Sequence, residues 1–580
     1  MQIVQSDIVL GEVTQNIAMM LEGNAARYSN RTMYGEKHNG EYCHTTWAEF
    51  LHSVRNVASN LARYGYQPGS KVMVYSPNRL EMLILEMAVM ASGGISVPIF
   101  AYFQKETVEI LLNHSDCSFV AVAGELQLSR LPQHANIKHV FVFDHLETLP
   151  YPNCVLFSEL LADHGSEPGA LLTDAPADDI CLNMYTSGTM GVPKCVQLTH
   201  RNILSQQAAL QHVWHLNEDD RLLAYLPWHH SFGGIFERFS ALYNGAALML
   251  ESSYGKDPGQ IMENWKQVKP SCFFSVPKVY QSLIELTRGD KEAEQLFFHS
   301  GLKFVFTAAA SLPETLSVEF EKRNIPVLEG WGLTETSPCC TITDPTLKRE
   351  KGIVGKPIPG VSIGIADDGE ICVKGPNVMV GYYKNDDANE KAFTADGWYC
   401  TGDVGELTPA GLKLVSRKDR IFKLANGEKV IPSDLEMLIQ SKCSYIAYAV
   451  IVGGGKEYPV ALLFPNRNEL SQPTGAVAST EGCKCPRSIN ELGNCLHTCL
   501  RQTNYSLLQK FAKIKFAMVI DDELSIERNT LTPSLKFAPN KIQEAYKAHI
   551  ENLYGSKNSI SEEVYIVNLT ADNPFVPETT

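Results

Sequence analysis

The chain has 580 residues, of which 44% are hydrophobic and 20% charged, with 50 basic and 65 acidic side chains. The formal charge of −15 disfavours a general nucleic-acid binder, because an acidic surface repels a phosphate backbone. The composition is close to the globular average, which excludes a disordered, collagenous or fibrous chain, and the length predicts about three or four domain-sized units. Small molecules are therefore the favoured partners.

The sequence predicts a cytoplasmic protein. Met1–Leu10 lacks the basic flank and apolar centre of a secretory signal. The least charged stretch, Met87–Gln104, approaches membrane-spanning length, but Gly93, Gly94 and Pro98 interrupt it. The 15 cysteines are scattered and odd in number, which favours reduced thiols over a disulfide framework. Peripheral association with a membrane surface stays open.

Helices and strands are predicted to alternate along the first part of the chain. A helical stripe of apolar residues runs from Thr46 to Tyr64 and ends at Gly65. The alternation continues with strands at Lys71–Ser76, Ile95–Phe100, Cys117–Val122, Arg221–Leu226, Ser271–Val276 and Lys303–Ala309, and with helices at Arg79–Ser92 and Lys105–His114. Because these strands are apolar at nearly every position, they indicate mostly parallel sheets covered on both faces, an α/β architecture.

The pattern changes after Pro357 to short strands and glycine turns. Strands are expected at Val361–Ala366, Gly369–Lys374 and Leu412–Val415, which predicts a small β-rich subdomain at about 357–418. A charged stretch, Arg417–Arg420, then follows a strand end. We therefore predict a large N-terminal domain at 1–418 and a smaller α+β C-terminal domain at 419–580, joined by a hinge.

The most specific motif is Tyr185–Lys194, which is rich in hydroxyls and glycines and ends in a lysine. Glycines let backbone N–H groups approach an anion, hydroxyls add donors, and a lysine supplies a point charge. This combination suits a polyphosphate, although it is not the GxxxxGK[ST] nucleotide loop. The alternative is an ordinary polar turn.

Through this segment the chain resembles the adenylate-forming superfamily, which includes acyl-CoA synthetases, luciferases and peptide-synthetase adenylation domains. The later motifs agree in order and spacing, so the resemblance covers nearly the whole chain. It implies that the loop wraps the β- and γ-phosphates of ATP through Thr186, Ser187, Gly188, Thr189 and Lys194. Met190 stands where threonine is common and Cys195 where glycine is common, but the principal donors remain.

A second motif, Gly330–Glu335, combines two glycines, an aromatic ring, a hydroxyl and a carboxylate. Such groups could seat a purine, hold a phosphate and bind Mg²⁺ through oxygen. The resemblance implies that Trp331 stacks on adenine beside Gly330 and Gly332, that Thr334 meets the α-phosphate, and that Glu335 binds the metal; it also assigns Ala309 to the cofactor site. The alternative is a helix start with Thr334 as its cap.

The motif Leu226–Phe232 contains two adjacent histidines. A single histidine is more often structural than catalytic. By resemblance His230 is the better candidate, contacting the substrate carboxylate or gating the acyl pocket, whereas His229 has no assigned role.

Three charged residues near the predicted domain boundary are further candidates. Asp403 ends the motif Trp398–Asp403, and a carboxylate there could accept both ribose hydroxyls. By resemblance Asp403 binds the ribose, Arg417 is the second ribose contact, and Asp419 is the hinge residue. The alternatives are a simple Asp turn and a solvated run of charges.

Lys536 lies in the motif Leu531–Lys536. Attack of a carboxylate on a phosphate brings two anions together, which calls for a neutralising cation. A single lysine is ordinarily a surface residue, but the resemblance implies this role for Lys536. It further implies that the C-terminal domain then rotates about Asp419, withdraws Lys536 and brings Gly427 toward the coenzyme A tunnel.

The sequence thus predicts an ATP-, Mg²⁺- and coenzyme A-dependent ligase for a medium- or long-chain fatty acid. Phe273–Lys278 and Val327–Thr336 look closest to long-chain acyl-CoA synthetases, but the short connection Leu286–Gly301 and the methyl groups of Ala308–Ala310 leave a medium-chain or unusual acid open. The alternatives are a ligase that loads a carrier protein's phosphopantetheine, and a non-catalytic nucleotide-binding regulator. Lys194, Glu335, Asp403 and Lys536 argue against the regulator.

One cysteine-rich cluster has no counterpart in these motifs. It consists of Cys483, Cys485, Cys495, His497 and Cys499. These side chains could hold zinc, but the spacing lacks a CxxC pair, so thiols packed in a helix core are the favoured interpretation.

Overall fold

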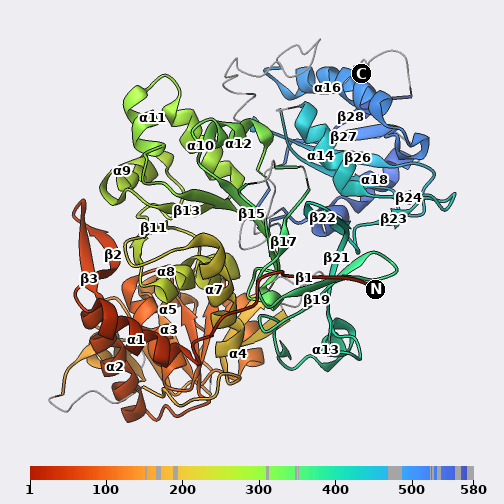
Figure 1. Ribbon diagram of the computed structural model, residues 1–580. Helices are drawn as coiled ribbons and strands as arrows, with labels where there is room; N and C mark the ends of the chain where they lie inside the picture. Colours follow the sequence, from red (N-terminus) through yellow and green to blue (C-terminus); the bar gives the residue numbers. More distant parts are fainter. Residues whose placement is uncertain are drawn as a thin grey trace. The chain divides into compact units, whose positions relative to one another are not determined.

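The computed structural model describes most of the chain. The described residues are 1–134, 136–150, 153–164, 171–186, 194–308, 312–346, 349–350, 352–443, 445–467, 470, 486–522, 524–525, 528, 530–531, 537–554 and 564–570. They form two compact units (Figure 1). The larger unit contains Met1–Thr401 and Glu406–Lys413, and the smaller contains Gly402–Gly405 and Leu414–Thr580.

An eight-stranded sheet carries the first α/β segment of the larger unit. In spatial order its strands are β20 (Gly381–Tyr382), β10 (Lys194–Thr199), β9 (Ile180–Thr186), β5 (Ile95–Ile99), β4 (Lys71–Tyr75), β6 (Phe119–Val122), β7 (His139–Val142) and β8 (Cys154–Leu156). The six strands from β9 to β8 are parallel to their neighbours, whereas β10 is antiparallel to both β9 and β20.

Helices cover both faces of this sheet. Met73 and Tyr75 of β4 pack with Val108 and Leu111 of α4 (Lys105–Ser115), while α3 (Leu80–Ala91) contacts β4, β5 and β9. Because alternate strand residues point to opposite faces, a strand covered on both sides must be apolar at every position. This explains the continuous apolar runs in the sequence.

A nine-stranded sheet forms the second layer of the larger unit. In spatial order its strands are β17 (Lys356–Pro357), β16 (Thr341–Ile342), β15 (Val327–Trp331), β14 (Phe304–Thr307), β13 (Cys272–Ser275), β11 (Arg221–Ala224), β12 (Ala247–Leu250), β2 (Thr32–His38) and β3 (Glu41–Thr46). The strands from β15 to β2 are parallel, and the strands at both edges are antiparallel. The predicted strand Lys303–Ala309 is thus observed as the shorter β14, and Ala309 lies outside the described residues.

Two helical layers enclose the nine-stranded sheet. On one face of β13, Phe274 packs against Trp214 of α7 (His200–Trp214). On the other face, the preceding residue Phe273 packs against Trp265 of α9 (Pro258–Val268) and Tyr280 of α10 (Pro277–Thr287). In Figure 1, α9 and α10 lie on one side of β11 and β13, and α7 and α8 (Arg238–Asn244) lie on the other.

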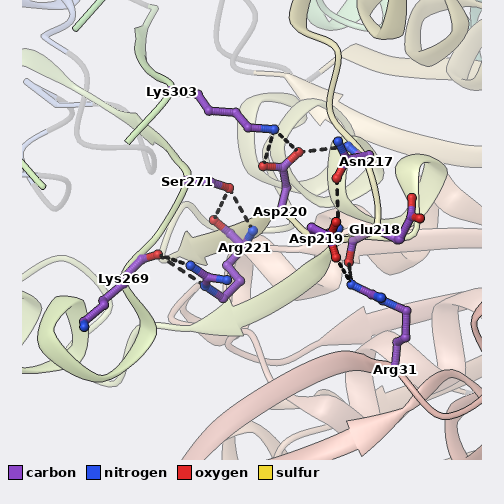
Figure 2. A network of polar contacts seen from close by, with 9 residues as sticks. All are labelled: Arg31, Asn217, Glu218, Asp219, Asp220, Arg221, Lys269, Ser271 and Lys303. Carbon is purple, nitrogen blue, oxygen red and sulfur yellow. Dashed lines mark hydrogen bonds and ion pairs between the residues drawn. The ribbon is translucent and has the colours of Figure 1, made fainter. Parts of the chain in front are cut away.

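A polar network fixes the amino ends of three of these parallel strands (Figure 2). The Nζ of Lys303 lies 2.8 Å from a carboxylate oxygen of Asp220, and the backbone N–H of Arg221 donates to Ser271 Oγ at 2.9 Å. Arg221 Nε also donates to the carbonyl of Val268 at 2.8 Å. The opposite, carboxyl ends of the same strands are therefore left for other groups, and ligands of open parallel sheets bind at that edge.

The remaining sheet links the two units along the sequence. Its strand order is β1 (Gln2–Gln5), β18 (Ser362–Ile365), β19 (Glu370–Lys374), β21 (Tyr399–Thr408) and β22 (Gly411–Arg417). The division between the compact units falls within β21 and β22. The short strands expected after Pro357 are thus present.

The smaller unit is an α+β sandwich. It contains the pair β23 (Phe422–Lys423) and β24 (Lys429–Val430), and a sheet of β25 (Ile446–Val452), β26 (Val460–Pro465), β27 (Phe516–Ile520) and β28 (Val564–Asn568). Alternate residues of the sheet pack against different helices: Ala461 and Leu463 contact a core with α14 (Pro432–Lys442) and α16 (Ile489–Ser506), whereas Val460 and Leu462 join α17 (Pro539–Ala545) and α18 (Lys547–Tyr554).

The cysteine-rich region lies partly on α16. Cys495 and Cys499 are buried there, whereas Cys483 and Cys485 lie outside the described residues. Within the part of the chain that the structure describes, no cluster of three or more His, Cys, Asp or Glu side chains has the geometry of a metal site.

The other elements complete the helical layers. They are α1 (Ile17–Tyr28), α2 (Trp47–Arg63), α5 (Glu125–Arg130), α6 (Phe157–Leu161), the π-helix η1 (Phe232–Glu237), α11 (Lys291–Phe297), α12 (Glu314–Glu321), the 3₁₀-helices η2 (Thr334–Thr336) and η3 (Lys510–Ala512), and α13 (Asp386–Ala392). None of the helices in the described ranges has both the length and the apolar character needed to cross a membrane. The predicted α/β class with a smaller α+β part is confirmed.

Candidate active site

Candidate residues of the larger unit follow the carboxyl ends of its parallel strands. His230 comes after β11, Thr334 and Glu335 follow β15, and Ala308, which precedes the candidate Ala309 in the sequence, comes directly after β14. Because these strands are neighbours or near neighbours in one parallel sheet, their carboxyl ends share an edge. The histidine motif and the Gly330–Glu335 motif are thereby assembled at one edge of this sheet.

Glu335 is buried and held by a segment far away in the sequence. The hydroxyl of Tyr382 donates to Glu335 Oε1 at 2.8 Å, and the backbone N–H of Met379 donates to the carbonyl of Glu335 at 2.8 Å. Both the side chain and the backbone of Glu335 are therefore fixed by residues 379–382. Among the described contacts, no donor reaches Glu335 Oε2.

Lys194 begins β10 opposite the start of the candidate phosphate loop. It pairs with Thr186 across the β9–β10 ladder, and Thr186 Oγ1 donates to the carbonyl of Lys194 at 3.4 Å. The Lys194 Nζ lies 4.6 Å from the centre of the Tyr382 ring. Tyr382 thus contacts both the candidate phosphate lysine and the candidate metal carboxylate.

Three other residues of the phosphate motif, Ser187, Gly188 and Thr189, lie outside the described residues. Cys195, which replaces the more common glycine, is buried, and desolvation raises the pKa of its thiol to about 12. A thiol with such a pKa stays protonated near neutral pH. Cys195 is consequently a packing residue of β10.

Thr334 joins the glycine-rich motif to the histidine motif. Its Oγ1 lies 2.9 Å from Ser231 Oγ, the residue directly after His230. His230 is oriented by its own turn, because the backbone N–H of Phe232 donates to His230 Nδ1 at 3.2 Å. His229 differs: burial lowers the pKa of its imidazole to about 4. His229 is therefore neutral at physiological pH.

The close approach of the chain to itself explains the glycines of the second motif. A Cβ at Gly332 would lie 1.8 Å from the carbonyl oxygen of Pro338, and one at Gly330 would lie 2.7 Å from the Phe306 ring. Trp331 between them is 6% exposed. The glycines are thus required by packing alone, and the assignment of Trp331 to adenine stacking stays a prediction.

In the smaller unit, Arg417 connects two of the other candidates. Its Nη1 donates to Asp403 Oδ1 at 2.9 Å, and its Nε lies 3.6 Å from Asp419 Oδ1. Asp419 also accepts a hydrogen bond of 3.2 Å from Asn540 Nδ2. Gly427 has φ +83° in an open turn where a Cβ would meet nothing within 4 Å. Lys536 lies outside the described residues, as does Ala309.

Sequence reasoning missed Tyr382 and Ser231. Ser231 lies inside the motif Leu226–Phe232 directly after His230, so its position could have indicated a role beside that histidine. Tyr382 stands in Val380-Gly-Tyr-Tyr383, which carries no charge or metal-ligand pattern. Its importance appears only once β20 pairs with β10 and brings its hydroxyl to Glu335.

Two protein-family models together match most of the chain. A model described as AMP-binding enzyme covers residues 21–383, and one described as AMP-binding enzyme C-terminal domain covers residues 419–558. The chain belongs to the AMP-binding enzyme family. The predicted membership of the adenylate-forming superfamily is thereby confirmed.

Several curated relatives of this family member are named as long-chain acyl-CoA synthetases or ligases. The peroxisomal long chain acyl-CoA synthetase 6 of Arabidopsis thaliana is 27% identical over 89% of this chain and 82% of the relative. The long-chain-fatty-acid–CoA ligase 6 of Homo sapiens is also 27% identical, over 83% of this chain and 78% of the relative.

Solved structures share the fold of this family member at lower identity. An anthranilate CoA ligase in complex with anthranoyl-AMP has a TM-score of 0.76 at 19% identity and covers 93% of this chain and 99% of its own. The O-succinylbenzoate coenzyme A synthetase of Bacillus subtilis, in complex with ATP and magnesium ion, has a TM-score of 0.71 at 22% identity, with 90% and 99% covered.

Proposed function

We propose that this chain is an acyl-CoA synthetase that activates a medium- or long-chain fatty acid with ATP and transfers it to coenzyme A. The observation that carries the proposal is the convergence of Lys194, Tyr382 and Glu335, because a cation and a metal-binding carboxylate held around one tyrosine suit a triphosphate. Membership of the AMP-binding family and the names of the curated relatives support it.

The proposed reaction proceeds in two balanced steps. A carboxylate oxygen attacks the α-phosphorus of ATP, an acyl–O–P bond forms, and the bond to pyrophosphate breaks. The thiol of coenzyme A then loses its proton to solvent and its sulfur attacks the acyl carbon. A thioester forms, and AMP leaves with the electron pair of the broken C–O bond. Splitting the reaction makes chemical sense because a free carboxylate is a poor electrophile, whereas AMP is a competent leaving group.

The residues at Glu335 fit a magnesium ion. Mg²⁺ prefers oxygen ligands, and it neutralises developing charge on phosphate oxygens when bound. The hydroxyl of Tyr382 donates to Glu335 Oε1 and so fixes the orientation of the carboxylate. No described donor contacts Oε2, which is therefore the oxygen that we propose for the metal. We therefore propose Glu335 as the protein ligand of this ion.

The other described groups of the larger unit would orient the two anions. Lys194 would bind the outer phosphates together with Thr186, Ser187, Gly188 and Thr189. Thr334, aligned by Ser231, would donate to the α-phosphate, and His230 would contact the substrate carboxylate. Trp331, with Gly330, Gly332 and Ala309, would form the adenine site.

In the smaller unit, the proposed roles concern the ribose and the change between half-reactions. Asp403 would accept both ribose hydroxyls, and Arg417 would contact the same sugar. Rotation about Asp419 would exchange Lys536, which neutralises charge during adenylation, for Gly427, which faces coenzyme A during thioester formation. A single site could then serve both steps in order.

An aromatic cluster supports an apolar acid. Phe232, two residues after His230, packs against Phe306 with ring centres 5.9 Å apart, and Phe236 packs against the same ring at 4.8 Å. Phe306 lies on β14, which leads directly to Ala308. Apolar side chains therefore continue from the residues that follow His230, the proposed contact of the substrate carboxylate, to β14.

The test is pyrophosphate release from the purified full chain with saturated acids of increasing length, with and without coenzyme A. We expect release with fatty acids and formation of acyl-CoA only when coenzyme A is present. Thioester formation only on a phosphopantetheinylated carrier protein would favour the carrier-loading alternative. No release with any acid would favour the regulator.

The catalytic assignment has a separate test. Lys536→Ala should lower adenylate formation by about 100-fold, since lost charge stabilisation of about 3 kcal/mol has that effect on a rate. Thioester formation from preformed acyl-adenylate should change little. Unchanged adenylate formation in this variant would show that Lys536 is not the neutralising cation.

A further inference from the structure

Tyr382 is fixed in the larger unit by three independent contacts. Its strand pairs with β10, where Tyr382 stands opposite Val196. Its backbone N–H donates to Asn389 Oδ1 at 2.6 Å, and its carbonyl accepts from Asn389 Nδ2 at 2.9 Å. The side chain is 4% exposed. The ring therefore has little freedom to change its direction.

The two ends of this side chain contact groups of opposite charge. The hydroxyl donates to Glu335 Oε1 at 2.8 Å and lies 3.4 Å from the hydroxyl of Tyr399. The Lys194 Nζ lies 4.6 Å from the ring centre, within the range of a cation–π contact. The tyrosine thus contacts a cation through its ring and an anion through its hydroxyl.

A direct ion pair would be harmful to the proposed chemistry. If Lys194 and Glu335 paired, the lysine would no longer be available to a phosphate and the carboxylate would no longer be available to a cation. A neutral hydroxyl orients the carboxylate without cancelling its charge. The aromatic face likewise attracts the ammonium through its quadrupole and leaves its charge in place.

From these contacts we infer that Tyr382 is a positioning residue, which aims Glu335 at the metal–nucleotide complex and keeps Lys194 apart from it. The inference rests on the proposed function, since it concerns how Lys194 and Glu335 are oriented for the proposed binding of ATP and metal. Residues that hydrogen-bond to a metal-binding carboxylate commonly change metal affinity by about 10- to 100-fold when altered. Tyr382 acts through Glu335 and Lys194, so it is not itself a catalytic residue.

The neighbouring residue provides a matched control. The hydroxyl of Tyr383 donates to Asp116 Oδ2 at 2.5 Å, and the Lys71 Nζ lies 3.7 Å from the centre of its ring. Tyr383 therefore also joins a carboxylate and a lysine, but at a half-buried position with no assigned part in nucleotide binding. Tyr383→Phe removes the same atom from the same kind of contact.

The first experiment measures metal affinity without catalysis. Mn²⁺ binding to the full-length protein is followed by electron paramagnetic resonance in the presence of α,β-methylene-ATP, which cannot release pyrophosphate. We expect Tyr382→Phe to raise the Mn²⁺ dissociation constant about tenfold. Tyr383→Phe should leave it unchanged, and the melting temperatures of both variants should stay close to that of the unaltered protein.

Glu335→Gln separates this inference from the proposed function. If Glu335→Gln weakens Mn²⁺ binding and Tyr382→Phe does not, the role of Tyr382 is refuted and the metal assignment stands. If Glu335→Gln has no effect, the metal assignment is refuted and the inference fails with it. Equal weakening in Tyr382→Phe and Tyr383→Phe would reveal a general structural effect and would also overturn the inference.

A second variant tests the aromatic ring. Tyr382→Leu removes the ring face from Lys194 as well as the hydroxyl from Glu335. Relative to Tyr382→Phe, we expect a further loss of about threefold in affinity for metal-free α,β-methylene-ATP, as a cation–π contact of roughly 0.5–1 kcal/mol predicts. AMP, which lacks the outer phosphates, should bind both variants equally. If Tyr382→Leu lost as much affinity for AMP as for α,β-methylene-ATP, the inference that Tyr382 keeps Lys194 available to the outer phosphates would be refuted.

Discussion

One charged cluster in each compact unit shows a contrast in exposure. In the larger unit, Arg238 and Glu86 form an ion pair in which both side chains are 0% exposed, and Ser96 Oγ donates to the same carboxylate at 2.9 Å. In the smaller unit, Arg417 is 43% exposed while it contacts Asp403 and Asp419. The Arg238–Glu86 pair is thus enclosed, whereas the Arg417 cluster keeps contact with water.

This difference matches the different tasks that we propose for the units. A buried charge that loses its partner is strongly destabilising, so enclosed pairs lock one arrangement. An exposed pair contributes only about 0–1 kcal/mol, so it can exchange partners at little cost. A preorganised phosphate and metal site needs the first property, and a segment proposed to act as a hinge needs the second.

The largest expected effect comes from breaking the enclosed pair. Arg238→Ala should destabilise the larger unit by about 3–5 kcal/mol, because Glu86 would be left buried without its cation. Urea unfolding followed by tryptophan fluorescence measures this loss. Arg201→Ala is the matched control, because its partner Asp178 is 71% exposed, and it should cost less than about 1 kcal/mol. Equal losses would contradict the comparison.

A buried acid of the larger unit should produce a pH effect of the next size. Desolvation raises the pKa of Glu237 well above its ordinary value, and the backbone of Leu226 offsets only part of this shift. Because the folded-state pKa of Glu237 is raised, its contribution to the free energy of unfolding is fully present below about pH 4.3, the ordinary pKa of a glutamate. This contribution is lost as the pH rises toward the folded-state pKa.

Glu237→Gln should therefore become more stable than the unaltered protein as the pH increases from 5 to 8, by at most about 1.4 kcal/mol per pH unit. Urea midpoints at each pH provide the measurement. Glu406→Gln, whose side chain is 56% exposed, should show no such trend. A stability difference that is independent of pH would show that Glu237 is ionised in the folded protein.

A third variant concerns the loop near the proposed adenine site. Leu312 is held at both backbone groups: its N–H donates to Glu329 Oε1 at 2.8 Å, and its carbonyl accepts from Arg349 Nη2 at 2.6 Å. Glu329 immediately precedes Gly330, so this clamp ties Leu312 to the strand that carries Gly330.

Glu329→Gln should raise the KM for ATP about tenfold, since one charge-assisted contact is worth roughly 1.5 kcal/mol, while the KM for coenzyme A should stay constant. Steady-state kinetics with each substrate varied in turn separates the two values. Glu319→Gln on α12, at a half-exposed ion pair with Arg323, serves as the control. An equal rise in both KM values would indicate a general loss of structure.

The smallest effect is expected in the smaller unit. Arg417→Lys keeps the charge but loses the fork that reaches Asp403 and Asp419. The stability should change by less than about 1 kcal/mol, and the KM for ATP by about two- to threefold. Calorimetry and the same kinetic assay test both values. A stability loss as large as that of Arg238→Ala would remove the distinction between the units.

Much of the α/β layering could be predicted because it depends on local patterns. The strands around Met73 and Val97 are apolar at every position, and that pattern alone indicates a strand covered on both faces. The end of β14 was predicted two residues too late, because the alanines that follow Thr307 are as apolar as the strand itself. Strand ends depend on pairing with a neighbour, which composition does not report.

The site motifs could be recognised from their residue types, but their supporting contacts could not. Glu335, Lys194 and Thr334 carry charges or hydroxyls in distinctive spacing, so the sequence indicates their chemistry. Tyr382 and Ser231 resemble ordinary core or turn residues, and their roles depend on partners 47 and 103 positions away. A contact between distant segments leaves no local pattern.

The sequence by itself determined the family, the alternation of helices and strands, and the residue types that could bind a triphosphate. Only the tertiary structure decided that Tyr382 stands between Lys194 and Glu335 and that His229 is enclosed. The physical reason is that periodicity and residue chemistry are properties of neighbouring positions, whereas burial and charge spacing arise when strands from distant parts of the chain pair and exclude water.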